Sequence, residues 1–182
     1  KTCHIPRIQS SMWRFRSKSQ GSTSNEMQFA LEGEINMRQT GYPEEPLLVG
    51  AAESIWGGSD VLINIGIDVG EKLIAWMRDC LPDALEGAFI TDSDIRHIMR
   101  KHGSNEEARG QRTIVPQDFA CIPTVLNEFD SCEHTDTDKL GNKKFLLRKD
   151  IGGDVYLVTI QRGKRKLQIK TMRKEARSGA AC

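Results

Sequence analysis

The spacing of apolar residues changes at Ser131, and this change constrains the fold of the 182-residue chain more than any other feature of its sequence. Before Ser131, apolar residues recur at the three- and four-residue intervals typical of helices. After it, Phe145, Leu147 and Ile151 stand in the alternating pattern of a strand with one buried face. Helices followed by strands predict an α+β fold, with N-terminal helices packed on a C-terminal sheet.

The C-terminal segment predicts a four-stranded antiparallel β-sheet. Residues 152–153 are Gly-Gly, a two-residue hairpin signal, and residues 162–164 read Arg-Gly-Lys, a second turn signal. A further turn at 139–142 separates the first two strands. We therefore expect strands at 132–138, between the turns at 139–142 and 152–153, at 154–161 and at 166–173.

Two helices are predicted before the sheet. The first covers residues 71–80 and ends before Pro82, because proline is common just after a helix C-terminus. The second is expected to begin with Ser93 as its N-cap residue, with Asp94 in its first turn, and to stop at Gly103 in a left-handed conformation. Its apolar stripe consists of Ile95, Ile98, Met99 and His102.

The rest of the N-terminal part is less informative. A β-branched run at 61–65 fits a buried strand without identifying its partner, and Pro116 and Pro123 each suit the first position of a short helix. The basic, Ser-rich start of the chain is typical of a linker. We therefore divide the chain into a linker or accessory region at 1–60 and a folded domain at 61–182.

Composition and charge exclude some classes of protein. No stretch approaches the roughly 18 uninterrupted apolar residues of a membrane-spanning helix, and the start lacks the apolar core of a secretion signal. The net charge of +1 hides an asymmetry, since residues 139–182 carry thirteen basic and three acidic residues, while 21–138 carry eight basic and 22 acidic ones. The basic block predicts either an anion-binding face or a solvated surface.

The cysteines do not indicate a metal site. No Cys-x-x-Cys pair and no His at metal-ligand spacing accompanies them, so we expect reduced thiols and no cofactor. In an oxidising compartment, the first or the last of them could form a cross-link. They are Cys3, Cys80, Cys121, Cys132 and Cys182.

The candidate chemistry lies on the second predicted helix and the last predicted strand. His97 and His102 carry side chains whose ordinary pKa lies near neutrality, so they can accept and return a proton. Arg109 follows in an Arg-Gly-Gln loop, and Lys170 and Thr171 lie near the end of the basic sheet. The charged side chains of Arg109 and Lys170 can neutralise the charge of a phosphorane-like transition state. Together these residues suit metal-free cleavage of RNA by attack of a 2′-hydroxyl on the adjacent phosphorus.

Each candidate also has a structural interpretation. His102 can close the helix by bonding a terminal carbonyl, although its position at the helix end makes it the preferred base or acid. At about 100° per residue, His97 points away from His102, so both share a pocket only if the pocket wraps around the helix end. Arg109 can be a solvated loop residue. Lys170 and Thr171 point to opposite faces of a strand unless a bulge intervenes.

Three segments resemble the phage-associated barnase/EndoU/colicin/RelE-like nucleases: IRHIMRKHG, RGQRTIVPQDFACIPTVLNEFD and KLQIKTMRK. The resemblance covers about residues 60–175. It implies helices on a four-stranded antiparallel sheet, metal-independent ribonuclease activity, and a toxin role held in check by an immunity protein. It matches the family's paired histidines to His97 and His102, its Arg-Gly-Gln segment to residues 109–111, and its terminal Ser/Thr to Thr171.

We therefore expect a ribonuclease toxin domain. It would form the C-terminal part of a secreted or phage-delivered protein and cleave RNA, with tRNA as a candidate, in the cytoplasm of a target cell. Its partners would be this RNA and an acidic immunity protein. The alternative is a non-catalytic module of a phage or secreted protein, whose basic sheet binds nucleic acid or an acidic partner. Salt-sensitive binding without a cleavage product would identify that alternative.

Overall fold

The computed structural model describes residues 41–78, 85–104, 111–163 and 165–177. The chain divides into two units, and all of these residues belong to the unit at 36–182. Its elements are α1 (Glu45–Trp56), β1 (Asn64–Ile67), α2 (Glu71–Arg78), β2 (Ala88–Thr91), α3 (Asp92–His102), the 3-10 helix η3 (Pro116–Ala120), α4 (Cys121–Glu128), β3 (Ser131–Thr137), β4 (Lys143–Ile151), β5 (Asp154–Arg162) and β6 (Leu167–Ala176).

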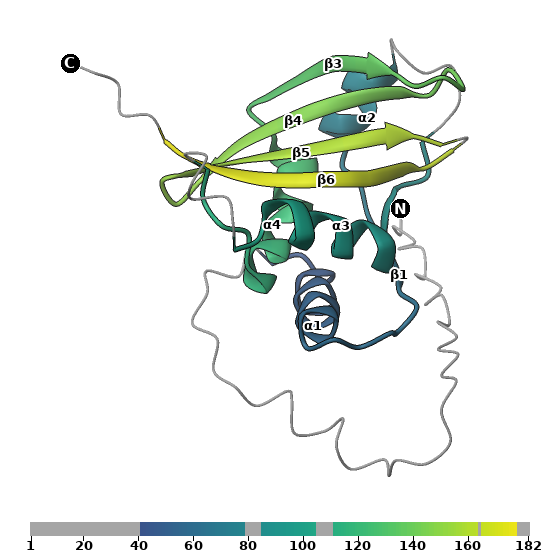
Figure 1. Ribbon diagram of the computed structural model, residues 1–182. Coiled ribbons are helices and arrows are strands. Elements are labelled where there is room, and N and C mark those ends of the chain that lie inside the picture. Colours follow the sequence, from purple (N-terminus) through teal and green to yellow (C-terminus); the bar gives the residue numbers. More distant parts are fainter. Residues whose placement is uncertain (1–40, 79–84, 105–110, 164, 178–182) are drawn as a thin grey trace, which may run out of the picture. The chain divides into compact units, whose positions relative to one another are not determined.

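The strands form one mixed sheet in the order β1-β2-β6-β5-β4-β3 (Figure 1). Strands β3 to β6 are the predicted antiparallel meander, and the mixed α+β class is confirmed. The predicted number of four strands was wrong, because β1 and β2 extend the sheet beyond β6 to six strands. Strand β2 has four residues and pairs in parallel with β6, where Ala88 is the partner of Leu167. Pairing between segments so far apart in the sequence leaves no local pattern to read.

Strand β1 lies further along the chain than the sequence predicts. The β-branched run at 61–65 was expected to be the strand, whereas the structure places it at Asn64–Ile67, antiparallel to β2. Ile65 and Ile67 enter the core, while Val61 and Leu62 remain exposed. The first residues of the apolar run therefore lead into the strand without belonging to it.

Helix α3, which carries both candidate histidines, begins and ends differently from the prediction. Its N-cap residue is Thr91 and not Ser93, and a capping box joins Thr91 to Asp94. Gly103 follows the helix with a φ of −80°, outside the left-handed region. A Cβ at Gly103 would lie 2.3 Å from the carbonyl oxygen of Met99, so close approach of the backbone is what requires glycine there.

The remaining predicted helices are present with small differences. Helix α2 confirms the helix expected at 71–80, whose last two residues lie outside the described part of the chain. Pro116 opens η3 as predicted. Helix α4 begins at Cys121, so Pro123 lies within its first turn, where a missing N–H breaks no helical hydrogen bond. No described helix is both long and apolar enough to cross a membrane.

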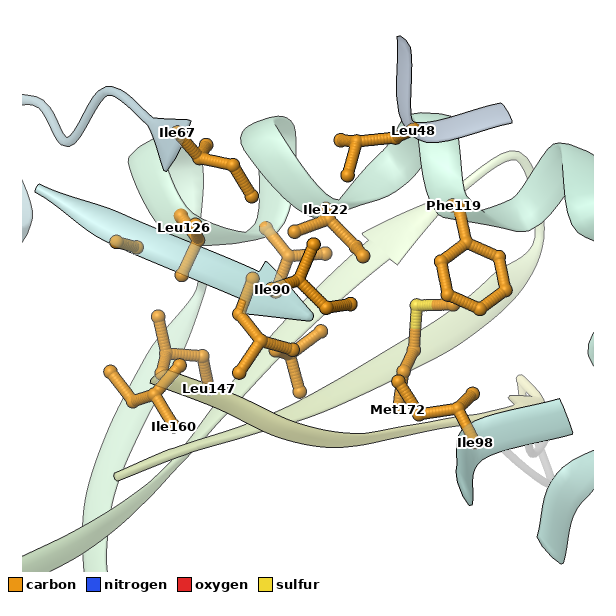
Figure 2. Packing of buried hydrophobic residues seen from close by; sticks show 14 of the residues in the cluster. Leu48, Ile67, Ile90, Ile98, Phe119, Ile122, Leu126, Leu147, Ile160 and Met172 are labelled. Atoms are coloured by element: carbon orange, nitrogen blue, oxygen red, sulfur yellow. The ribbon is translucent and has the colours of Figure 1, made fainter. Parts of the chain in front are cut away.

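Helix α1 lies within residues 1–60, the region that we expected to be a linker or accessory segment. Its Leu48 and Ala52 are fully buried in the same hydrophobic cluster as the sheet residues. Figure 2 shows Leu48 at the core near Phe119 and Ile122. In Figure 1, α1, α3 and α4 lie on one side of the meander, and the core fills the space between them. The described residues before 61 are therefore part of the folded body.

Candidate active site

The two faces of the meander differ in chemistry. One face carries apolar side chains of the core, among them Phe145, Leu147, Val158, Ile160 and Met172. The opposite face, here called the outer face, carries the alternate residues of β4, β5 and β6 and offers hydroxyl, amide and guanidinium groups. The residues of the outer face are Leu146, Arg148, Leu157, Thr159, Gln161, Thr171 and Arg173.

A break in the strand register places Lys170 at a β-bulge. Thr159 and Ile160 are consecutive on β5, but their partners on β6 are Thr171 and Ile169, which leaves Lys170 without a partner in the register. Because of this bulge, the side chains of Lys170 and Thr171 need not point to opposite faces of the sheet. Lys170 has the same strand parity as Gln168, and both side chains reach Asp94 at the start of α3.

The carboxylate of Asp94 joins α3 to β6. Only 5% of its side chain is exposed, and it accepts hydrogen bonds from Gln168 Nε2 at 2.8 Å and Lys170 Nζ at 2.9 Å. The Thr91 hydroxyl donates to the same carboxylate at 2.6 Å. Burial alone would raise the pKa of Asp94, but these hydrogen bonds and the Lys170 charge outweigh it and hold the pKa below its ordinary value. Asp94 is therefore an ionised anchor for the Lys170 ammonium.

His97 lies three residues after Asp94 and is its neighbour on the helix surface. Its ring is partly buried, and this burial is the first cause that lowers its pKa. The imidazole is therefore neutral near pH 7 and can accept a proton. Nearby cationic groups lower the pKa further: Arg100, Lys101, His102 and Lys170.

The segment at 112–114 lies between the end of α3 and β6 and forms backbone hydrogen bonds to both. The N–H of Ile114 donates to the carbonyl oxygen of His102 at 2.7 Å, and the N–H of Arg112 donates to the carbonyl oxygen of Lys174 at 2.9 Å. His102 is thus separated from β6 by this segment, whereas His97 lies close enough to Lys170 for its charge to be felt. Arg109, the fifth predicted site residue, lies outside the described residues.

Some buried polar atoms lack a hydrogen-bond partner within the described part of the chain. Two of them, Thr171 Oγ1 and Gln111 Oε1, belong to segments that the sequence analysis singles out. A buried polar atom without a partner costs about 1–3 kcal/mol, so such atoms in a native protein call for an explanation. Thr171 lies on the outer face opposite Thr159, where its hydroxyl retains the capacity to bond an oxygen of a bound anion.

The family model of the phage-Barnase-EndoU-ColicinE5/D-RelE like nuclease 3 domains matches residues 84–180, more than half of the chain. The chain belongs to this nuclease family. No curated protein and no solved structure matches the chain.

Membership of the phage-Barnase-EndoU-ColicinE5/D-RelE like nucleases implies a nucleic-acid substrate and hydrolytic nuclease chemistry. The matched region contains β2, α3 and β6, and with them His97, His102, Lys170 and Thr171. Within the described residues, no three His, Cys, Asp or Glu side chains form a group that could hold a metal ion. The candidate residues of this nuclease thus lie in the family's own region, and α1, β1 and α2 precede it.

Sequence reasoning missed the roles of two buried carboxylates in this nuclease. It assigned Asp94 only to a first helical turn, although Thr91 three residues earlier is a visible capping-box signal. Asp118 on η3 was not singled out at all. It accepts hydrogen bonds from Lys174 Nζ at 2.8 Å and from the Tyr156 hydroxyl at 2.7 Å, and so anchors η3 to β5 and β6.

The remaining His and Cys residues in the described part of the nuclease lie away from the candidate site or are unreactive. His134 is an exposed residue of β3, and β4 and β5 separate it from β6. Cys121 and Cys132 are free cysteines. Burial raises the pKa of Cys121 to about 11, so its thiol stays protonated and is a poor nucleophile. The other cysteines lie outside the described residues: Cys3, Cys80 and Cys182.

Proposed function

We propose that the chain is a ribonuclease toxin domain that cleaves RNA without a metal ion. The observation that carries this proposal is the position of His97, whose pKa is lowered, beside Lys170, whose ammonium is anchored by Asp94. A neutral imidazole can act as a general base, and a fixed cation can stabilise the charge that develops on phosphorus oxygens. The nuclease family supports a nucleic-acid substrate for this pair.

In the proposed reaction, the His97 imidazole removes the proton of a ribose 2′-hydroxyl. The 2′ oxygen forms a bond to the adjacent phosphorus, and the bond from phosphorus to the 5′ oxygen breaks. His102 donates a proton to the departing 5′ oxygen, so the products are a 2′,3′-cyclic phosphate and a 5′-hydroxyl. Lys170 neutralises the developing negative charge, while Arg109 and the Thr171 hydroxyl bind the phosphate oxygens.

The surroundings of His97 decide which of the two histidines is assigned as the base. Burial and neighbouring cations favour the neutral form of His97, which suits a base. His102 is the other histidine of the pair and the last residue of α3, so protonation of the leaving group is assigned to it. His97 therefore takes the role of base, and His102, for which sequence left both roles open, takes the role of acid.

Incubation of the purified chain with total RNA in excess EDTA tests this function. We expect cleavage with 2′,3′-cyclic phosphate ends, because every group in the proposed reaction belongs to the protein or to the RNA. RNA that stays intact at stoichiometric amounts of protein would reject the ribonuclease proposal. Cleavage that disappears with the chelator would reject metal independence alone.

The pH dependence of cleavage tests the assignment of His97. A base must be unprotonated, so the rising limb of kcat/KM against pH should report the pKa of His97, which lies below the ordinary 6.5. Lys101→Gln removes one of the charges that lower this pKa. The rising limb should therefore move to higher pH, toward 6.5.

Arg78→Gln at the end of α2 is the matched control for the pH profile, since it removes an equal charge that is not among the causes of the His97 shift. Its rising limb should coincide with that of the wild type. An NMR titration of the His97 ring should show the same displacement in Lys101→Gln. A limb that stays in place or moves to lower pH in Lys101→Gln would contradict the assignment.

We extend the proposal to the biological role that the family resemblance implies. The domain would be delivered to a target cell by a secreted or phage-borne protein, act in its cytoplasm, and be held in check by an acidic immunity protein. Expression of the chain in a bacterial cytoplasm should stop growth, and His97→Ala should restore it. Equal growth inhibition by the wild type and by His97→Ala would show that the toxicity does not depend on the proposed cleavage reaction.

A non-catalytic nucleic-acid-binding module is the second candidate. It is favoured by the engagement of Lys170 with a buried carboxylate, a contact that would also serve a purely structural role. In that case, RNA binding should weaken steeply with salt while the RNA remains intact, because release of counterions drives such binding. The EDTA incubation and a binding titration on the same sample distinguish the two candidates.

A further inference from the structure

Two turns of the meander lie at the same end of the sheet. Thr137 pairs with Lys143 where β3 turns into β4, and Arg162 pairs with Leu167 where β5 turns into β6. These turns are neighbours, since the Gln161 amide donates to the carboxylate of Asp138 at 2.8 Å. Figure 1 shows both turns at one end of the strands and the β4–β5 turn at the other. We call residues 138–144 together with 161–163 and 165–167 the hairpin end.

The hairpin end carries an excess of positive charge. Its one acidic residue, Asp138, is occupied by the turn, where it accepts hydrogen bonds from the N–H groups of Leu140 and Asn142. Two of its cations form exposed ion pairs outside it, Lys144 with Asp136 at 3.5 Å and Arg165 with Glu86 at 2.9 Å, and such pairs are weak in water. The basic residues described there are Lys139, Lys143, Lys144, Arg162, Arg165 and Lys166.

The opposite end of the sheet shows no comparable excess among its described residues. Asp150 pairs with Arg177 at 3.3 Å, and Asp154 pairs with Arg112 at 2.8 Å. Glu175 pairs with Arg173 at 3.3 Å, so acidic and basic groups alternate there. An anionic polymer that lies on the outer face is therefore attracted toward the hairpin end.

The hairpin end is close to the candidate site along β6. Lys166 and Lys170 are four residues apart, which corresponds to about 13 Å of extended strand. Gln168 lies between them, and the tip of the β3–β4 turn carries Leu140, whose side chain is 87% exposed. A strand of RNA with its reacting phosphate at Lys170 can thus place its next phosphates on the hairpin end and an unpaired base against Leu140.

We propose that the hairpin end binds the phosphate backbone of single-stranded RNA next to the cleaved bond, so that the preferred substrate is an oligonucleotide and not a dinucleotide. This inference rests on the proposed function for the position of the reacting phosphate. The cations of the hairpin end are binding residues and take no part in proton transfer.

The test compares two double variants of the full chain that lose the same charge. Lys143→Gln/Lys166→Gln alters the hairpin end, and Arg78→Gln/Arg177→Gln alters exposed positions away from it. The probes are a dinucleotide and a single-stranded RNA of about twelve nucleotides, a length in the range of known single-strand sites. The measurements are kcat and KM for both probes, and binding of the longer probe as a function of salt.

The hairpin variant should raise KM for the longer RNA about tenfold near 0.1 M salt. The slope of log binding constant against log salt concentration should become shallower by about 1.4, because two phosphate contacts are lost. Dinucleotide cleavage, and kcat for both probes, should not change. The control variant should resemble the wild type. Equal effects on both probes, equal effects of both variants, or an unchanged salt slope would overturn the inference.

The outcomes also separate this inference from the proposed function. If the wild type cleaves neither probe, the ribonuclease proposal fails, but the salt dependence of binding still shows whether RNA contacts the hairpin end. If it cleaves both and the hairpin variant does the same with unchanged KM, the inference fails alone. In that case, the charge of the hairpin end would serve an acidic protein partner.

Discussion

Replacement of His97 by alanine is expected to slow RNA cleavage by about 10²–10⁴-fold, the usual contribution of a general base. The loss should appear in kcat, because the neutral His97 imidazole is the group to which we assign removal of the 2′ proton. Cleavage of a fluorescent oligonucleotide under single-turnover conditions measures it. Thermal unfolding should change little, since His97 is only partly buried.

His134→Ala is the matched control, because His134 is exposed on β3, where it contacts Thr137 and the Phe145 ring, and β4 and β5 separate it from β6. It should cleave RNA at the wild-type rate. A substrate with an activated leaving group then separates base from acid, since such a group departs without a proton. His102→Ala should regain most of its activity on that substrate, while His97→Ala should not. The reverse pattern would exchange the two roles.

Replacement of Asp94 is expected to cause a large loss of stability. The Asp94 side chain is almost fully buried, caps α3 and accepts hydrogen bonds from Gln168 and Lys170. Asp94→Ala removes the cap and these bonds at once, and we expect it to lower the free energy of unfolding by about 2–4 kcal/mol. Lys170 is partly exposed and can be rehydrated, which keeps the loss below that of a fully buried pair. Urea unfolding followed by circular dichroism measures it.

The pH dependence of this loss identifies its electrostatic part. The pKa of Asp94 is depressed in the folded state, so its charge stabilises the fold above the ordinary pKa of 3.8 and ceases to do so as pH falls through the depressed value. The difference in stability between wild type and Asp94→Asn should therefore shrink in acid. Asp136→Asn, which breaks an exposed pair with Lys144, should cost less than about 1 kcal/mol. A comparable loss in both variants would show that burial of Asp94 contributes little.

The parts of the fold that sequence predicted are those held by local signals. Alternation around Phe145 and Leu147, together with glycine turns, indicated the meander, because neighbouring strands joined by tight turns need no distant partner. Helix α1 escaped notice although Leu48, Ala52 and Ile55 recur at helical spacing. Gly50 and Pro46 within it and Pro43 just before it weaken such an interpretation.

The candidate site was only partly predictable for a similar reason. His97, Lys170 and Thr171 could be chosen by chemical type, and their catalytic roles remain predictions. The bulge at Lys170 depends on the pairing of β6 with β5, and the contact with Asp94 depends on the pairing of β6 with β2. The pairing of β6 with β2 is long-range, and the bulge is a change of register inside the β5–β6 hairpin. A periodic pattern within one segment encodes neither of them.

The position of β6 has a consequence for the order in which the fold can assemble. It follows every other described strand in the chain, yet it lies between β2 and β5 in the middle of the sheet. Helix α3 can form as soon as its residues are synthesised, but Lys170 cannot bind Asp94 until β6 has followed β5. Strand β2 therefore joins the meander only when β6 is inserted between β2 and β5.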